Sequence, residues 1–346
     1  MFRTSACRVE RWCDKTMSVM RERQLEACQD RLYRCPAAGI FGKLCADEAD
    51  HLFRLSYYAK EIKTKIPSQE ELKALVLARA EREACFLSPR EDDLVKRMIM
   101  GEGETYIDEW EEISAAEALI SRLWCSLQIV DEENARLCMA KELIDPVSKA
   151  MMTEKYFQSK ARLFSFDATL HSLLYLSGFL HASVPMTHFY RQMSKEADAL
   201  SGVLLARYMR AAFDYTETPE GEILLLHPGL ADPENLLSVL SKLPPTELEI
   251  TRDMMVGGMN GMLPEEVASC ETMRGALIGA IRPEYGDEEA LEDLRMMAKQ
   301  GANLAEMKEV MESMLCVLPT PRMLEALSQL HLQTVRWIGM PSAVVN

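Results

Sequence analysis

Apolar residues recur every three or four positions through much of the chain, which is the spacing of one face of an α-helix. Three of these stretches begin with a serine that is followed three positions later by a glutamate, at Ser68, Ser88 and Ser114. Serine and glutamate in this arrangement can cap the free backbone N–H groups at the start of a helix. The third stretch is expected to continue as a helix whose apolar face comprises Leu119, Ile120, Leu123, Trp124 and Leu127.

The most apolar stretch extends from Leu163 to Ala182 and includes Asp167, His171 and His181. A membrane-spanning helix needs about 20 consecutive apolar residues, and the uninterrupted apolar runs in this stretch are much shorter. We therefore expect a buried helix that Pro185 terminates, and no transmembrane segment.

The helical pattern is interrupted between residues 216 and 235, where prolines and glycines surround the sequence EILLL. Because such residues favour turns and loops, we expect a linker here, with one short strand near 222–226. The predicted fold is all-α, built from multi-helix bundles. Four parts are predicted: an N-terminal helical arm rich in cysteine at 1–62, a helical domain at 63–215, a linker at 216–245 and a C-terminal helical domain rich in methionine at 246–346.

The numbers of basic and acidic residues limit the kinds of partner that the chain is expected to bind. The chain carries 39 basic and 54 acidic residues, a net charge of −15, which disfavours binding to nucleic acid because phosphate contacts require clustered lysine and arginine. Residues 1–34 differ, with eight basic and five acidic residues. A basic segment on an acidic body suits contact with an acidic partner or a membrane surface, although a solvated helix of mixed charge explains the same composition.

The ten cysteines and six histidines show neither the Cys-x-x-Cys nor the His-Glu-x-x-His spacing of common metal and redox sites. The glycine-rich stretch 257–262 lacks the lysine and hydroxyl residue of a phosphate-binding loop. We therefore expect no metal, no cofactor and reduced thiols. His171, His181 and His188 are the candidates for a ligand pocket, with hydrogen-bonded core histidines as the alternative.

Methionine is frequent in the C-terminal part of the chain, and its flexible side chain fits irregular gaps and adaptable partner grooves. Met307, Met311 and Met314 follow the i, i+4, i+7 spacing that places them on one face of a helix. Core packing is the simplest explanation of this face. The alternative is a surface that receives a helix of a partner protein.

The same region carries the signals of a helical hairpin, because Gly301 can end one helix and Asn303 with Glu306 can cap the next. The stretches NGMLPEEVASCETMRGALIGAI, LEDLRMMAKQGANLAEMKEVM and LPTPRMLEAL, within about residues 261–327, resemble the carboxymuconolactone decarboxylase and alkylhydroperoxidase family of helical domains. The residues at matching family positions are Gly301, Ala302, Glu306, Glu309, Val310 and Pro319.

The resemblance also bears on activity. Peroxidatic members of the family carry a Cys-x-x-Cys pair and a histidine before this turn, whereas the present chain has Gly286, Glu289 and Asp293 at about those positions. A redox activity is therefore disfavoured even where the helical fold is shared.

These observations predict a non-catalytic helical protein that acts as an interaction or assembly subunit, with other protein subunits or a second copy of the chain as partners. The alternatives are an enzyme of the carboxymuconolactone decarboxylase and alkylhydroperoxidase-like class with atypical residues, and a helical protein that binds a small ligand. The start of the sequence has arginines but no apolar signal-peptide core. An intracellular, cytoplasmic location is therefore expected, with a mitochondrial one as the alternative.

Overall fold

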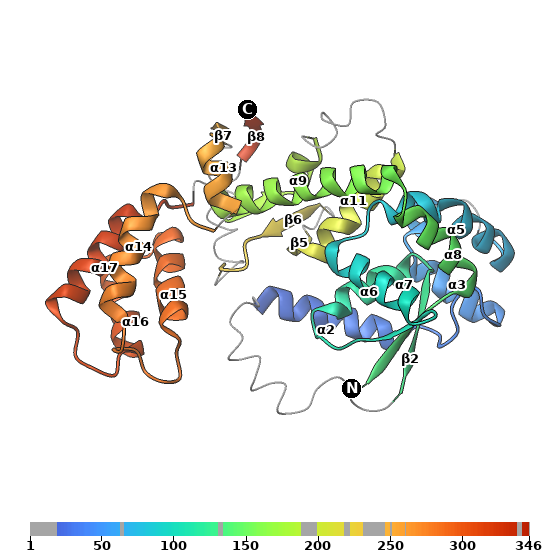
Figure 1. Ribbon diagram of the computed structural model, residues 1–346, viewed down its shortest axis with the longest axis horizontal. Coiled ribbons are helices and arrows are strands. Elements are labelled where there is room, and N and C mark those ends of the chain that lie inside the picture. The colour runs from blue at the N-terminus through green and yellow to red at the C-terminus, as the bar shows by residue number, and fades with distance from the viewer. Residues whose placement is uncertain are drawn as a thin grey trace. The chain divides into compact units, whose positions relative to one another are not determined.

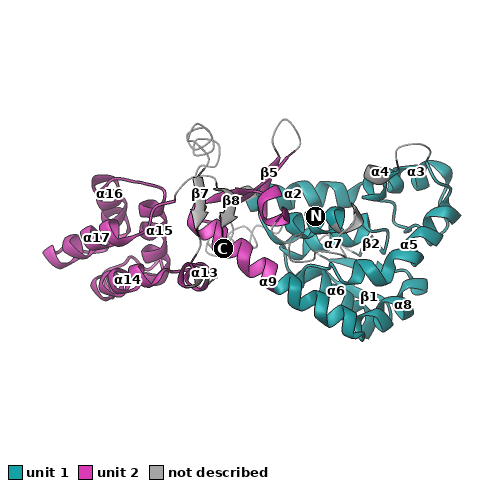
Figure 2. Cartoon of the chain, turned by 90° about the horizontal axis from the view of Figure 1, so that it is seen from above, with its two compact units in different colours: residues 1–164, 196–213 teal, residues 165–195, 214–346 magenta. Residues whose placement is uncertain are grey.

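The computed structural model describes residues 19–62, 66–130, 134–187, 199–217, 222–230, 246–249, 251–259, 261–337 and 341–345. These residues are mostly helical and include small sheets (Figure 1). The chain divides into two compact units, of which unit 1 comprises residues 1–164 and 196–213, and unit 2 comprises 165–195 and 214–346 (Figure 2). Residues 165–195 are grouped with the C-terminal half of the chain in unit 2.

Unit 1 is built mainly from helices of the N-terminal half. They are α2 (Val19–Tyr33), α3 (Ala46–Leu55), α4 (Tyr58–Glu61), α5 (Gln69–Ala84), α6 (Pro89–Met100), α7 (Glu112–Ser121), α8 (Lys141–Met151) and α11 (Ala199–Ala212). The capping boxes predicted at Ser68 and Ser88 are confirmed. The one predicted at Ser114 is wrong, because α7 already begins at Glu112 and Ser114 lies inside the helix, donating to the Glu111 carbonyl.

The sheet of unit 1 is antiparallel, with the strand order β1 (Glu104–Tyr106), β3 (Ala135–Met139), β2 (Cys125–Ile129). Buried and partly exposed residues alternate along β2 and β3, as in a sheet with one face on the core. The predicted helical class therefore holds for most of the described residues, but this sheet departs from the all-α prediction. The helix expected to continue through Trp124 and Leu127 ends at Ser121, and the chain then forms β2.

Unit 2 contains a second antiparallel sheet of order β4 (Phe179–His181), β6 (Ile223–Leu226), β5 (Asp214–Glu217). The short strand predicted near 222–226 is confirmed as β6. The apolar helix predicted from Leu163 to Ala182 begins and ends earlier: α9 (Glu154–Ser177) begins in unit 1 and ends just before Gly178, whose φ of 78° turns the chain into β4. Elsewhere in unit 2, β7 (Thr246–Glu249) pairs in parallel with β8 (Pro341–Val345), and α13 (Arg252–Met259) follows β7.

The remaining helices of unit 2 form a bundle of α14 (Pro264–Leu277), α15 (Asp287–Lys299), α16 (Leu304–Met314) and α17 (Pro321–Gln333), which Figure 1 shows side by side. The helical hairpin predicted between α15 and α16 is confirmed. Gly301 has a φ of 89°, and the Asn303 side chain accepts hydrogen bonds from the N–H groups of Ala305 and Glu306, both over 3.0 Å. Across the described ranges, every helix is too short or too polar to span a membrane.

Candidate functional site

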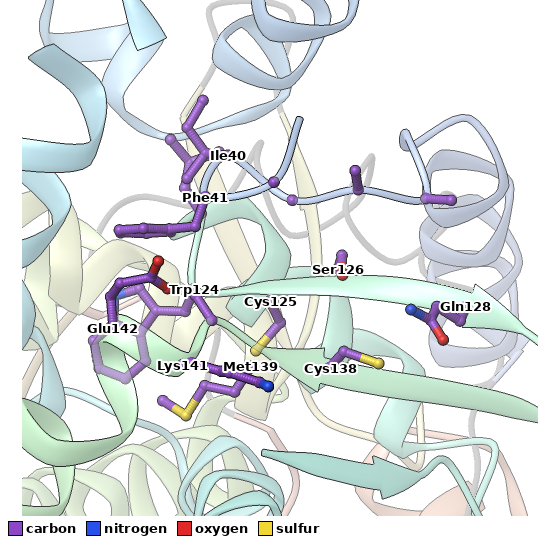
Figure 3. Close-up of a pocket in the computed structure, with 16 residues that line it drawn as sticks. Ile40, Phe41, Trp124, Cys125, Ser126, Gln128, Cys138, Met139, Lys141 and Glu142 are labelled. Atoms are coloured by element: carbon purple, nitrogen blue, oxygen red, sulfur yellow. The ribbon is translucent and has the colours of Figure 1, made fainter. Parts of the chain in front are cut away.

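A pocket of about 330 Å³ lies in unit 1 on the partly exposed side of the β2–β3 hairpin (Figure 3). Its floor includes Ser126, Gln128 and Cys138, the hairpin side chains that alternate with the buried ones. Segment 37–42 forms one wall, and the first turn of α8 forms another. The volume lies at the lower end of the range for pockets that bind small molecules or single side chains.

Segment 37–42 is held in place by hydrogen bonds. The N–H of Gly42 donates to the Gly39 carbonyl over 2.8 Å, which closes a turn. The side-chain amide of Gln69, the first residue of α5, donates to the carbonyls of Ile40 and Gly42 over 2.6 and 2.8 Å. Ile40 is buried, whereas Phe41 is partly exposed and faces the pocket (Figure 3). The start of α5 therefore fixes this wall.

The turn from α7 into β2 places Trp124 at one end of the pocket. Leu123, which also lines the pocket, has a φ of 61°, a left-handed conformation that costs a residue other than glycine about 1–2 kcal/mol. The backbone N–H of Trp124 then donates to the Leu119 carbonyl over 3.2 Å and closes the end of α7. Backbone strain of this kind is concentrated at functional sites, which supports a functional role for the pocket.

The indole N–H of Trp124 has no acceptor. The residue is fully buried, and its Nε1 atom has no hydrogen-bond partner within the described part of the chain. Leaving a buried donor unpaired costs about 1–3 kcal/mol. In Figure 3 the Trp124 ring lies with Phe41 and Glu142 at one end of the pocket. Because Trp124 has no exposed surface, its indole N–H is not open to a molecule in the pocket.

Helix α8 begins at the pocket without a side-chain cap. Its N-cap residue is Ala140, so no side chain accepts from the N–H groups of the first turn. These N–H groups and the helix dipole favour an acceptor at this position. Lys141 and Glu142, whose charges are opposite, are both exposed at the rim. The polar groups deeper in the pocket, on Trp124, Ser126 and Gln128, are uncharged.

The thiols that line the pocket are not activated. Burial raises the pKa of Cys125 well above its ordinary value, and the neighbouring Cys138 acts in the same direction. Burial and Glu104 also raise the pKa of Cys138, against an opposing effect of Arg136. Because a nucleophilic cysteine needs a lowered pKa and no histidine lines this pocket, the arrangement suits binding rather than thiol catalysis.

The structure does not bring the predicted histidines to this pocket. His171 lies on α9 with 55% of its side chain exposed, and its Nε2 atom is 3.4 Å from the Asp167 carboxylate. His181 lies on β4, with Nδ1 3.4 Å from the Glu222 carboxylate. His188 lies outside the described residues.

A different histidine, His227, has the most distinctive surroundings. Its ring lies 6.1 Å from the Tyr175 ring and 5.6 Å from the Trp337 ring, measured between centroids. Burial lowers the pKa of His227 to about 3, and the positive charge of Lys299 contributes. Since Nδ1 accepts from the Gly229 N–H over 3.0 Å, this residue is a neutral, packed histidine. No spacing in the sequence distinguishes it.

The methionine face packs the core, which is its simplest explanation, and does not form the alternative partner surface. Met307 and Met311 are 0% exposed and Met314 is 5% exposed, all within the core of the α14–α17 bundle. The three side chains share one face of α16, as predicted, but the other helices of the bundle cover it. The face therefore packs the core and is not open to a partner.

Metal-binding residues do not gather in the described ranges, where no group of three or more His, Cys, Asp or Glu side chains is arranged to hold an ion. No family model, curated protein or solved structure matches the chain. The resemblance to the carboxymuconolactone decarboxylase and alkylhydroperoxidase family therefore stays a prediction, and the function has to be argued from the pocket.

Proposed function

We propose that this protein is a non-catalytic interaction or assembly subunit that binds a short extended segment of another protein in the pocket beside β2. The observation that carries the proposal is the pocket of about 330 Å³ on the partly exposed side of β2, which is an edge strand within the described sheet.

The polar groups in the pocket suit a peptide better than a charged small molecule. Ser126 and Gln128 are partly exposed and offer uncharged donors and acceptors, which backbone amides can pair with. Lys141 and Glu142 at the rim offset each other, so the lining has no net charge that would select an ion. The rest of the lining is mainly apolar and suits one apolar side chain of the bound segment.

The position of β2 supports the same proposal. Within the described sheet, β2 is an edge strand that pairs only with β3, so alternate backbone N–H and C=O groups point away from the sheet. Extended peptides commonly bind along such edges, with a pocket that receives one of their side chains. The net charge of −15 favours a segment with basic flanking residues, because opposite charges speed association.

Peptide display against the purified full-length chain tests the proposal. Ser126→Phe fills the floor of the pocket from a partly exposed position on β2. Thr105→Phe adds the same ring on β1, the other edge strand of the sheet, and is the matched control. Selected peptides should bind wild type and Thr105→Phe equally, and bind Ser126→Phe at least about tenfold more weakly, a difference of about 1.4 kcal/mol.

Two outcomes would overturn the proposal. One is a selection that enriches no peptide sequence, and the other is a set of peptides that bind Ser126→Phe as tightly as wild type. A small uncharged ligand is the second candidate occupant, because the pocket volume suits one. That candidate is supported if a compound without a peptide backbone binds the wild type and loses binding in Ser126→Phe.

A further inference from the structure

We infer that the bound segment extends the three-stranded sheet of unit 1 as a further strand beside β2, and that alternate N–H groups of the segment pair with the backbone of Leu127 and Ile129. This inference rests on the proposed function and specifies how the segment is recognised. Because proline has no N–H to donate, recognition through the backbone selects an extended segment without proline at its paired positions.

The hydrogen bonds between β2 and β3 decide which backbone groups of β2 face outward. The Val130 N–H, at the end of β2, donates to the Asn134 carbonyl over 3.0 Å. Along an antiparallel pair, residues that bond to the partner strand alternate with residues that do not. The even-numbered residues of β2 therefore bond to β3, and the N–H and C=O groups of the odd-numbered residues, which include Leu127 and Ile129, point away from it.

The outward groups of β2 are open along the second half of the strand. The wall formed by segment 37–42 passes beside the start of β2, where a Cβ atom at Gly39 would lie 3.6 Å from the Cys125 carbonyl. Farther along, the described residues supply no hydrogen bond to the outward groups of Leu127 or Ile129. Ile129 is also 53% exposed. The open part of the edge therefore begins where the wall ends.

The opposite edge of the same sheet, β1, is occupied by groups of the chain itself. The Ile107 N–H donates to β3 over 3.0 Å, so Glu104 and Tyr106 face outward by the same alternation. The Glu104 N–H donates to the Gly101 carbonyl over 3.2 Å. The Arg97 guanidinium donates to the Tyr106 carbonyl over 3.5 Å. A further strand would have to displace both bonds to pair with β1.

The two edges also differ in how they are protected. Natural proteins keep edge strands from further pairing by making them very short, by placing charges on them or by covering them. Strand β1 has three residues, and one of them is Glu104. Strand β2 has five residues, and none of them is charged. Of the two edges, the one beside the pocket is thus the one suited to receive a strand.

The pocket and the open edge fit one segment. Ser126 and Gln128 line the pocket from β2 (Figure 3). Residues directly opposite each other on paired strands have their side chains on the same face of the sheet, so the segment residue opposite Gln128 faces the pocket. Its two neighbours lie opposite Leu127 and Ile129 and make the backbone hydrogen bonds. The segment therefore has an apolar residue for the pocket between two residues whose N–H groups are required.

Backbone methylation of a display-selected peptide tests the inference on the wild-type, full-length chain. The peptide is synthesised with one N-methyl group at each position in turn, and the affinity of each product is measured. We expect a loss of at least about tenfold at two positions that are two residues apart, and of less than about threefold at the position between them. Losses that do not alternate, or no loss at any position, overturn the inference. A selection that yields no peptide overturns both the inference and the proposed function.

Hydrogen exchange distinguishes a partner segment from a second copy of the chain. The amides of Leu127 and Ile129 should exchange slowly when the peptide is bound and quickly without it, whereas the amide of Gln128 is already bonded to β3 and should change little. If Leu127 and Ile129 become protected as the protein concentration rises without peptide, the edge pairs with a second copy and the inference is wrong.

Proline substitutions supply the test on the protein. Ile129→Pro removes an outward N–H from the open edge, and Tyr106→Pro removes one from β1 as the matched control; proline is tolerated at such edge positions. Ile129→Ala keeps the N–H and shortens the side chain. We expect a loss of affinity of at least about tenfold for Ile129→Pro, a smaller loss for Ile129→Ala and none for Tyr106→Pro, with all three folded by near-ultraviolet circular dichroism. If Ser126→Phe blocks the selected peptides while Ile129→Pro and methylation do not, the proposed function stands and this inference fails.

Discussion

Replacing Arg122 by methionine should destabilise unit 1 by about 3–5 kcal/mol, the cost of removing one partner from a buried ion pair. The Arg122 side chain is fully buried, as are its two partners, with Nε 3.1 Å from Glu91 and Nη1 3.6 Å from Glu83. It also donates to the Phe86 carbonyl over 3.3 Å. Because Arg122→Met leaves two carboxylates in the core of α5, α6 and α7, we expect the upper part of this range.

The size of the loss should depend on pH through Glu83. Burial raises the pKa of Glu83, and the positive charge of Arg122 opposes that rise, so the pKa should rise further in Arg122→Met. A carboxyl group with a raised pKa in the folded state contributes stability below its unfolded pKa and loses that contribution as the pH rises through the folded-state pKa. The penalty of Arg122→Met should therefore be smaller at pH 5 than at pH 8.

Urea unfolding of the wild type and variants at pH 5 and pH 8 measures both effects. Arg54→Met is the matched control, because Arg54 has 68% of its side chain exposed and pairs with Asp50 over 2.8 Å on α3. Exposed pairs contribute about 1 kcal/mol or less. Hydrogen–deuterium exchange should show the lost protection in unit 1. A penalty as small as that of Arg54→Met, or one that grows as the pH falls, would refute the reasoning.

Three other substitutions test backbone strain, packing and protonation. Glu102→Gly should raise stability by about 0.5–1 kcal/mol in thermal unfolding, because exposed Glu102 has a φ of 57°; a lower melting temperature contradicts this. Gly178→Ala should cost much more than Gly279→Ala in urea unfolding. Both residues have positive φ, but a Cβ atom would lie 2.5 Å from Trp337 at Gly178 and have nothing within 4 Å at Gly279; equal costs would exclude the clash. Burial lowers the pKa of the His227 ring to about 3, so unfolding takes up a proton below pH 6.5 and stability falls by at most about 2 kcal/mol from pH 6.5 to pH 5. His227→Gln should lose less over the same interval, and an unchanged slope would count against a buried neutral ring.

The sequence predicts a helix start correctly where the residues that cap the helix are close together in the chain. Ser68, Ser88 and Asn303 each cap the helix that follows, because the cap and its partner lie three residues apart and need nothing from the rest of the fold. Ser114 matches the same pattern, yet α7 begins before it. Its hydroxyl accepts from the buried Arg21 side chain over 2.9 Å, a contact between distant segments that no local pattern contains.

The sequence pattern does not predict the strands of unit 1, because one stretch of sequence fits both the helical and the strand spacing of apolar residues. Leu119 and Ile120 with Leu123, Trp124 and Leu127 fit a helical face, but residues 125–129 and 135–139 also alternate between buried and partly exposed positions. Alternation of this kind in two neighbouring stretches is a signal for a β-hairpin. The left-handed Leu123 was not readable, because glycine, the residue that usually marks such a turn, is absent from the position.

The methionine face shows why a periodic pattern predicts a surface but not what covers it. Met307, Met311 and Met314 follow helical spacing whether their face meets the same chain or a partner. Here α14, α15 and α17 close around α16 and bury the three side chains. His171 and His181 do not line the pocket for a related reason, because an apolar helix alone does not specify which of its polar residues meet a cavity.

The candidate pocket depends on how three helices of unit 1 begin or end. Gln69 at the start of α5 holds the wall, Leu123 after the end of α7 sets the turn into β2, and Ala140 before α8 leaves an uncapped helix start. The left-handed Leu123 and the uncapped start of α8 cost stability. The Gln69 amide bonds to the pocket wall and so does not serve its own helix. Rigid elements that present a strained turn and an uncapped helix start to one cavity are the arrangement expected when a scaffold is adapted to bind. The helices of unit 1 therefore supply the support, and the small sheet supplies the surface on which a partner segment would be recognised.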